Sequence, residues 1–156
     1  VMRERPTILL TERTTHLSTH SGQVAFPGGK ADPTDADAAH TALREAQEEI
    51  GLAPSLVEVV GTLPTYTTGT QFIITPMVAL VRPDHRLAIN AFEVADAFEV
   101  PLDFLMNPRH HHRHAFEWGG VRREWFSMPY MDGPTERFIW GATAGMLRNF
   151  YRFLAA

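Results

Sequence analysis

Hydrophobic positions along this chain fall mostly in short runs bounded by turn residues, and two segments show the longer repeat of a helix. The short runs predict strands within 6–13, 22–29, 55–66 and 71–81. Residues 97–106 predict a strand that turns into a short helix at Pro101. Residues 114–131 predict a hairpin whose turn is Gly119-Gly120.

The strongest helical segment is 32–52, where Asp35 or Asp37 is expected to cap the start and Gly51 to end the helix. A second helix is expected over 141–156, with apolar residues at helical spacing. Strands joined by one early and one late helix predict an α+β fold. We expect an α/β/α sandwich in which helices flank a mixed central sheet, built as a single domain over 1–156.

Composition excludes several classes of function. The 156 residues include no cysteine, which excludes disulfide frameworks, cysteine-ligated zinc and a thiol nucleophile. The net charge of −4 provides no field for a nucleic-acid backbone. The longest apolar run, FIITPMVALV, is too short for a membrane span and contains Pro76. We therefore expect a cytoplasmic protein that binds neither nucleic acid nor membrane. Because the chain begins at Val1-Met2 close to the first predicted strand, we expect that the true N-terminus is missing or disordered.

Three carboxylates share one face of the first helix. Glu45, Glu48 and Glu49 stand at positions i, i+3 and i+4, where like charges repel unless a cation lies among them. Because Mg²⁺ prefers oxygen ligands, this face predicts half of a coordination shell for Mg²⁺ or Mn²⁺, with other positions open to phosphate and water. A solvated helix face is the alternative interpretation.

The same segment resembles the Nudix box, the loop–helix–loop signature of hydrolases that cleave a nucleoside diphosphate linked to another moiety. The matching residues run from Arg44 to Leu52, in the pattern Arg-Glu-Ala-x-Glu-Glu-x-Gly-Leu, downstream of Gly28-Gly29. The box glutamate expected eight residues before Arg44 is replaced by Ala36, between two aspartates. The resemblance implies the Nudix fold, with its loop–helix–loop, and a pyrophosphatase that requires Mg²⁺ or Mn²⁺.

The residues upstream of the box resemble the coenzyme A pyrophosphatase branch of this family. Its signature runs from LLT-x-R, here Leu9 to Arg13, to FPGG, here Phe26 to Gly29. The chain departs from it at Ser18, where that branch has an arginine. The resemblance implies cleavage of coenzyme A or its derivatives to 3′,5′-ADP and (acyl)phosphopantetheine. Pyrophosphatases for ADP-ribose, dinucleotides or oxidised nucleotides are the alternatives within the family, and a non-catalytic nucleotide-sensing module is the alternative outside enzymes.

The resemblance also implies catalytic roles. Glu45 and Glu49 would be the primary metal ligands, and Glu48 a further ligand or a residue that holds a water of the metal shell. Arg44 would orient these carboxylates. The base would be a box glutamate or a later loop acid, for which Glu93 is the candidate; an exposed loop acid is the equal alternative.

Other residues are expected at the substrate. Gly28 and Gly29 would let the backbone approach phosphate and metal, so Gly29 is counted with the metal site. Arg13 would offer a fork to a phosphate, and protonated His16 and His20 would replace the charge lost at Ser18, with simple exposure of each histidine as the favoured alternative. Trp118, Trp125 and Phe126 are interpreted as core or dimer contacts rather than an adenine-stacking site, so a homodimer is among the expectations.

Overall fold

The structure is a computed structural model that describes residues 1–16 and 22–156. Two three-stranded sheets make up most of it. The first has the order β2 (Val24–Ala25), β1 (Thr7–Arg13), β7 (Val94–Pro101), and the second has the order β10 (Thr135–Trp140), β9 (Val121–Asp132), β8 (His112–Trp118). Two-stranded pairs join β3 (Val57–Thr62) to β6 (Met77–Val81) and β4 (Tyr66–Thr67) to β5 (Ile73–Ile74). Within the described residues every strand pair is antiparallel.

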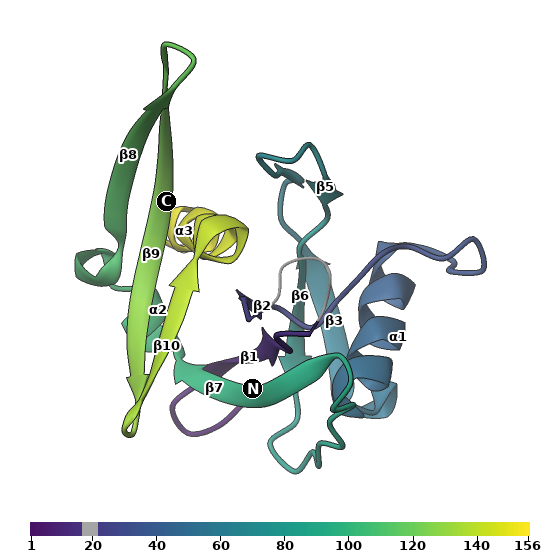
Figure 1. Cartoon of the computed structure of the whole chain (residues 1–156). Helices are drawn as coiled ribbons and strands as arrows, with labels where there is room; N and C mark the ends of the chain where they lie inside the picture. Colours follow the sequence, from purple (N-terminus) through teal and green to yellow (C-terminus); the bar gives the residue numbers. More distant parts are fainter. Residues whose placement is uncertain (17–21) are drawn as a thin grey trace.

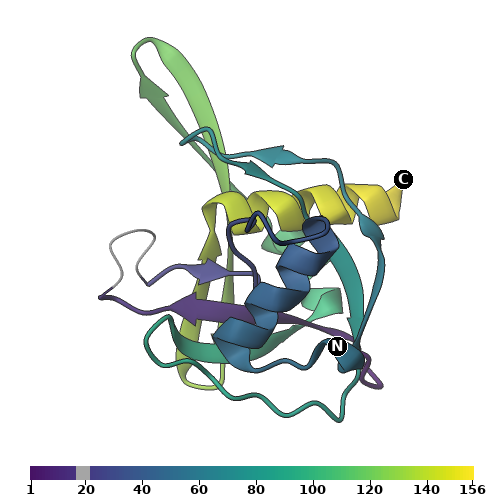
Figure 2. The same ribbon diagram turned by 90° about the vertical axis from the view of Figure 1, so that its right-hand side faces the viewer.

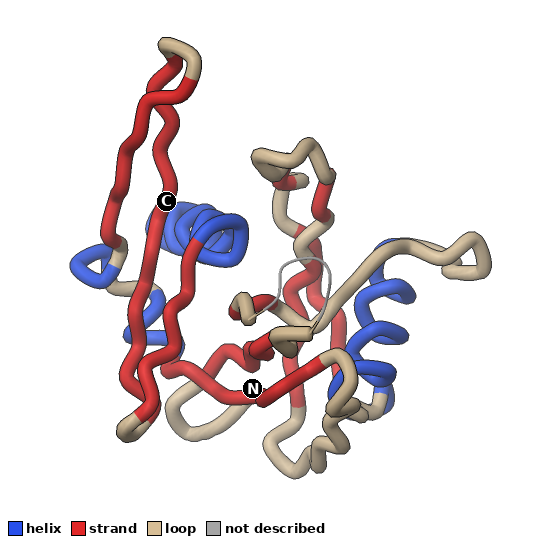
Figure 3. The backbone as a smooth tube through the Cα atoms, viewed as in Figure 1, coloured by secondary structure: helices blue, strands red, loops and turns tan. Residues whose placement is uncertain are grey.

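Three helices complete the fold: α1 (Ala38–Ile50), α2 (Leu102–Leu105) and α3 (Gly141–Ala155), with single 3-10 turns η1 (Pro54–Leu56) and η2 (Pro108–His110). Figure 1 shows α3 beside the sheet of β8, β9 and β10, whereas α1 lies on the opposite flank beside β3 and β6. The same arrangement of helices and strands can be followed by type in Figure 3. None of the helices in the described part of the chain is long and apolar enough to cross a membrane.

Two apolar clusters hold the elements together. The larger cluster joins both sheets to α3, through residues such as Leu10, Val100, Met128, Ile139 and Leu147. The smaller cluster joins α1 to the first sheet, where Ala46 and Ile50 pack with Leu9 and Val94. The apolar face of α1 is therefore buried, and its carboxylate face is left to build a site.

The expected α+β class is confirmed, and the hairpin 114–131, both long helices and the strand-to-helix turn at Pro101 are found close to their expected bounds. The segment 135–140 was not predicted as a strand, but it forms β10. The alternation of polar and apolar residues expected for a strand is missing from this segment because Arg137 occupies a buried position. There it pairs with Glu12, Asp96 and Asp132. A buried arginine with three carboxylate partners reads as a polar position in the sequence.

Candidate active site

The helix α1 begins and ends where the sequence predicts. The Asp37 side chain accepts a hydrogen bond of 2.8 Å from the His40 N–H, and so caps the first turn. Gly51 ends the helix in the left-handed conformation with φ of 67°, which a residue with a side chain rarely adopts. These two ends fix the length of α1 and hence the direction in which its glutamates project.

Arg44 is held by Asp35, which the sequence predicted only as a possible cap of the helix. Its Nε and Nη2 donate to the two oxygens of Asp35, each at 2.8 Å, and the pair holds the pKa of Asp35 well below its usual range. Asp35 lies next to Ala36, the position where the box glutamate is replaced. The sequence therefore contains an acid that binds Arg44, one residue before the position where the box glutamate is expected.

The remaining donors of Arg44 reach the helix carboxylates. Nη1 lies 3.1 Å from Glu45 and 3.3 Å from Glu48, and Nη2 also donates to the Lys30 carbonyl at 3.1 Å. Arg44 therefore ties the loop before α1 to two of the three glutamates. This geometry agrees with the orienting role expected for it.

Glu49 is the buried carboxylate of the site. Its side chain accepts a hydrogen bond of 2.8 Å from the Gly28 N–H, and the residue is only 5% exposed. Burial raises the pKa of Glu49 to about 7, the Gly28 hydrogen bond opposes that rise, and the like charges of Glu45 and Glu93 add to it. A buried carboxylate surrounded by like charges favours binding of either a proton or a cation.

Glu45 lies against the second glycine of the pair. A Cβ atom placed on Gly29 would stand 2.5 Å from the Glu45 carboxyl carbon and 2.8 Å from each of its oxygens. Only glycine leaves room for this approach. Burial raises the pKa of Glu45, while the hydrogen bond from Arg44 lowers it. The pair Gly28-Gly29 thus receives one glutamate at each residue.

The end of β1 brings Glu93 to the same place. The Thr14 N–H donates to the Glu93 carbonyl at 3.2 Å, and the Thr14 hydroxyl donates to the Phe92 carbonyl at 2.9 Å. The charge of Glu93 adds to the rise in the pKa of both Glu45 and Glu49 that burial causes, so its carboxylate lies within electrostatic range of theirs. Arg13, at the end of β1, lowers the pKa of Glu49, and its buried Nε has no hydrogen-bond partner within the described residues.

The donor set suits a divalent cation in chemistry, although the described residues contain no group of three acidic or imidazole side chains arranged to hold one. Mg²⁺ is commonly bound by one or two carboxylates together with waters and substrate phosphate. Glu45 and Glu49 supply that pair, and a cation would relieve the repulsion that adds to the effect of burial on their pKa values. The residues therefore fit a cation held by two carboxylates better than a closed three-carboxylate site.

The other predicted residues lie apart from this pair. The side chain of Glu48 is 55% exposed and pairs with Arg44, so it would have to turn away from Arg44 to join a cation site. His20 and Ser18 lie outside the described residues. The predicted residues brought together are thus Glu45, Glu49 and Glu93 with the glycine pair, and Arg13 at the edge.

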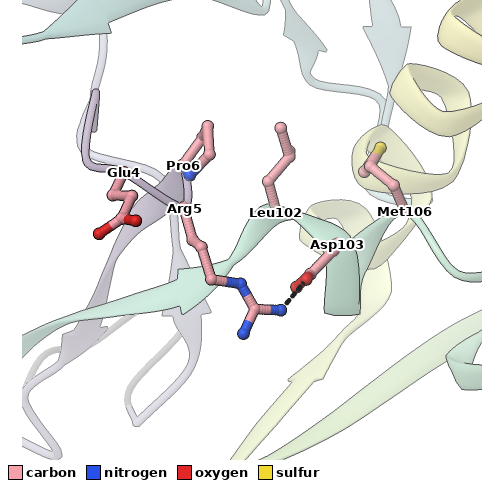
Figure 4. A pocket seen from close by; sticks show the side chains of 6 residues that line it. All are labelled: Glu4, Arg5, Pro6, Leu102, Asp103 and Met106. Atoms are coloured by element: carbon pink, nitrogen blue, oxygen red, sulfur yellow. Dashed lines mark hydrogen bonds and ion pairs between the residues drawn. The ribbon is translucent and has the colours of Figure 1, made fainter.

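A hollow of about 310 Å³ elsewhere in the molecule contains none of the predicted residues. Figure 4 shows it between the N-terminal segment and α2, lined by Glu4, Arg5, Pro6, Leu102, Asp103 and Met106. An ion pair between Arg5 and Asp103 lies across it, and both side chains are exposed. An exposed ion pair over a shallow apolar floor gives no indication of catalysis.

Comparisons with known proteins give the same family as the box. The model of the NUDIX domain matches residues 1–131. The "Uncharacterized Nudix hydrolase NudL" of Escherichia coli K12 is 42% identical over 150 residues, which cover 96% of this chain and 76% of that protein. The protein of the same description from Shigella boydii serotype 18 matches to the same extent.

Two solved structures share the fold. A Nudix hydrolase from M. smegmatis, RenU, superposes with a TM-score of 0.52 at 27% identity and covers 62% of this chain and 61% of that one. A C. elegans Ap4A hydrolase superposes with a TM-score of 0.52 at 17% identity, covering 62% of this chain and 70% of that one. The second likeness, at this identity, concerns the fold alone.

Proposed function

The chain belongs to the Nudix hydrolase family, and from that premise we propose that it cleaves the diphosphate of coenzyme A or its acyl derivatives with Mg²⁺ or Mn²⁺. The products would be 3′,5′-ADP and (acyl)phosphopantetheine. The observation that carries the proposal is the packing of Glu49 and Glu45 against Gly28 and Gly29, the end of the FPGG segment, with Glu93 within electrostatic range of both glutamates.

The cation supplies charge neutralisation at the diphosphate and activation of water. Glu45 and Glu49 would hold it, with Glu48 as a further ligand once its side chain leaves Arg44. Arg44 keeps Glu45 in place through the 3.1 Å hydrogen bond between them, and Asp35 keeps Arg44 in place. The Gly28 N–H fixes one oxygen of Glu49, which leaves the other oxygen for the cation.

Glu93 is the candidate base. It comes from a loop that Thr14 anchors by two hydrogen bonds, and its charge acts on the helix carboxylates from outside their helix. A group in that position can take a proton from the attacking water while the helix carboxylates stay ionised. Exchange of Glu93 for glutamine should therefore lower kcat by about 10²–10⁴-fold and leave cation binding in place.

Arg13 is the candidate contact to the substrate phosphates. It closes β1 beside Glu93, and its buried Nε lacks a partner among the described residues, so a phosphate oxygen would satisfy it. The LLT-x-R segment that ends at Arg13 is the part of the sequence that favours coenzyme A over other diphosphates. Ser18, where the branch has an arginine, is the departure that the substrate test has to address.

The test is a substrate panel in which coenzyme A, acyl and oxidised coenzyme A, ADP-ribose, dinucleotides and oxidised nucleotides are compared with Mg²⁺ and with Mn²⁺. Formation of 3′,5′-ADP and phosphopantetheine at the highest kcat/KM supports the proposal. A higher kcat/KM on ADP-ribose, a dinucleotide or an oxidised nucleotide refutes the assignment of coenzyme A. Tight binding of a nucleotide by calorimetry with no metal-dependent product would indicate a sensing module.

A further inference from the structure

The edge strand β8 is exposed over nearly its whole length. Of its seven residues, His112–Trp118, all but His114 are exposed, and Trp118 is 75% exposed. Its inner neighbour is β9, and within the described residues no strand or backbone hydrogen bond occupies the outer edge. Figures 1 and 2 show the β8–β9 hairpin extending beyond the body of the molecule.

This edge has few of the usual barriers to pairing. Natural edge strands are commonly blunted by charged side chains, above all lysine, or by proline or a bulge. The strand β8 contains neither lysine nor proline and pairs with β9 in unbroken register, and its two charged residues of fixed sign, Arg113 and Glu117, have opposite charges. The solvent face of the same sheet carries large exposed apolar side chains: Phe116, Trp118, Val121, Phe138 and Trp140. An open edge beside an apolar face is typical of an association surface.

We propose that β8 pairs antiparallel with β8 of a second copy of this chain, about a two-fold axis through Ala115. Residues directly opposite each other in an antiparallel pair exchange either two hydrogen bonds or none. The two-fold axis that relates two copies of one strand therefore passes through a residue and not between two residues. An axis through Ala115 is the one that pairs all seven residues of β8. The seam would join the two three-stranded sheets into one six-stranded sheet.

The sequence of β8 is complementary to itself in that register. Arg113 of one copy stands opposite Glu117 of the other, and the two-fold axis repeats the pair. On the other face, His114 meets Phe116 and His112 meets Trp118, so the most exposed aromatic residue gains a ring partner. Shifting the axis to His114 or Phe116 shortens the seam and removes the Arg113–Glu117 pairing. Charge and overlap therefore favour a second copy over an unrelated peptide.

A seam of one strand pair is smaller than the roughly 800 Å² per partner of a standard stable interface. We therefore expect a reversible dimer with a dissociation constant of about micromolar order. The inference does not depend on the proposed function, because the hairpin and α1 lie on opposite flanks (Figure 1).

The first test is a charge swap followed by sedimentation velocity over a concentration series. R113E and E117R each place like charges opposite one another and should weaken the dimer at least about tenfold, whereas R113E/E117R should restore it. Within one copy Arg113 lies near Glu124 and Glu117 lies opposite Arg122, so both local costs persist in the double variant. Recovery of the dimer can then come only from the seam. Arg82→Glu, an exposed position in another ion pair, is the matched control.

The second test uses the absence of cysteine in the chain. A115C should form an intermolecular disulfide on mild oxidation, because the two Cβ atoms would lie about 5 Å apart across the axis. V121C, equally placed on the exposed hairpin, should not, because its symmetry mate would lie more than about 20 Å away. A chain that stays monomeric at all concentrations overturns the proposal. So does a dimer that ignores the single charge changes, a double variant that fails to dimerise, or equal cross-linking of both cysteine variants.

Discussion

The contact between Gly29 and Glu45 allows the site to be perturbed by a single methyl group. In Gly29→Ala the new Cβ would lie 2.5 Å from the Glu45 carboxyl carbon, so the carboxylate has to move by about 1 Å to reach ordinary van der Waals contact. Gly29 does not have a positive φ, so alanine brings no backbone strain there. The displacement is confined to the flexible end of the Glu45 side chain.

A misplacement of about 1 Å in a catalytic group costs on the order of 10²-fold in rate, which corresponds to about 2.7 kcal/mol in activation free energy. We expect kcat/KM of Gly29→Ala to fall by that factor. Its free energy of unfolding should stay within about 1 kcal/mol of the unmodified chain, because the core clusters do not include Gly29.

Gly69→Ala is the matched control. No atom lies within 4 Å of a Cβ at Gly69, which has no positive φ and lies between β4 and β5, outside the residues assigned to the site. The assay is steady-state hydrolysis at saturating Mg²⁺ on the best substrate of the panel, with thermal unfolding of both variants. If Gly29→Ala hydrolyses as fast as Gly69→Ala, the position of Glu45 does not matter to the reaction and the reasoning fails.

Three further predictions concern the carboxylates around the site and the sheets. Asp35→Asn should lower kcat about tenfold by loosening Arg44, whereas Asp37→Asn, an equally good helix cap, should leave the rate unchanged; steady-state kinetics of the two variants compare them. The Arg3 guanidinium lowers the pKa of Glu99 to about 2, so Glu99 contributes stability above its ordinary pKa of 4.5 that is lost as pH falls toward 2. Because the Arg3 side chain is 42% exposed and solvent screens the pair, this contribution should be about 1 kcal/mol. The gap in unfolding free energy between the unmodified chain and Glu99→Gln should close over that range in urea titrations. Arg137→Met should cost about 2–3 kcal/mol in the same titrations, since three carboxylates lose their shared cation; a variant as stable as the unmodified chain would show that the cluster contributes nothing net.

Much of the fold follows from the sequence because its signals are local. Asp37 and Gly51 act within one turn of α1, and Gly119-Gly120 lies at the turn of the β8–β9 hairpin. The same locality made the family recognisable, since Arg44, Glu45 and Glu49 lie within one helix. The fold and the family were therefore predictable without knowledge of long-range contacts.

What escaped prediction depends on contacts between distant residues. Arg137 is buried because Glu12 and Asp96 reach it from another sheet, and no window around β10 contains that information. The run of histidines at 110–112 gives no sign in the sequence that distant residues hold one of them. His111 hydrogen-bonds the Leu105 carbonyl and Arg148 of α3, and burial lowers its pKa. In the site, the nearness of Glu93 to Glu49 arises from Thr14 and the end of β1, which sequence spacing does not reveal.

The measurement that tests the account most directly is Mg²⁺-dependent hydrolysis by Glu49→Gln. Glutamine keeps the acceptor for the Gly28 N–H and removes one charge from a buried, repulsive group, so the unfolding midpoint should stay equal or rise. Glu48→Gln, at an exposed position on the same face, provides the comparison. We predict that Glu49→Gln loses metal-dependent turnover while it remains folded. A Glu49→Gln protein with the turnover of the unmodified chain would contradict the assignment of this carboxylate to the cation.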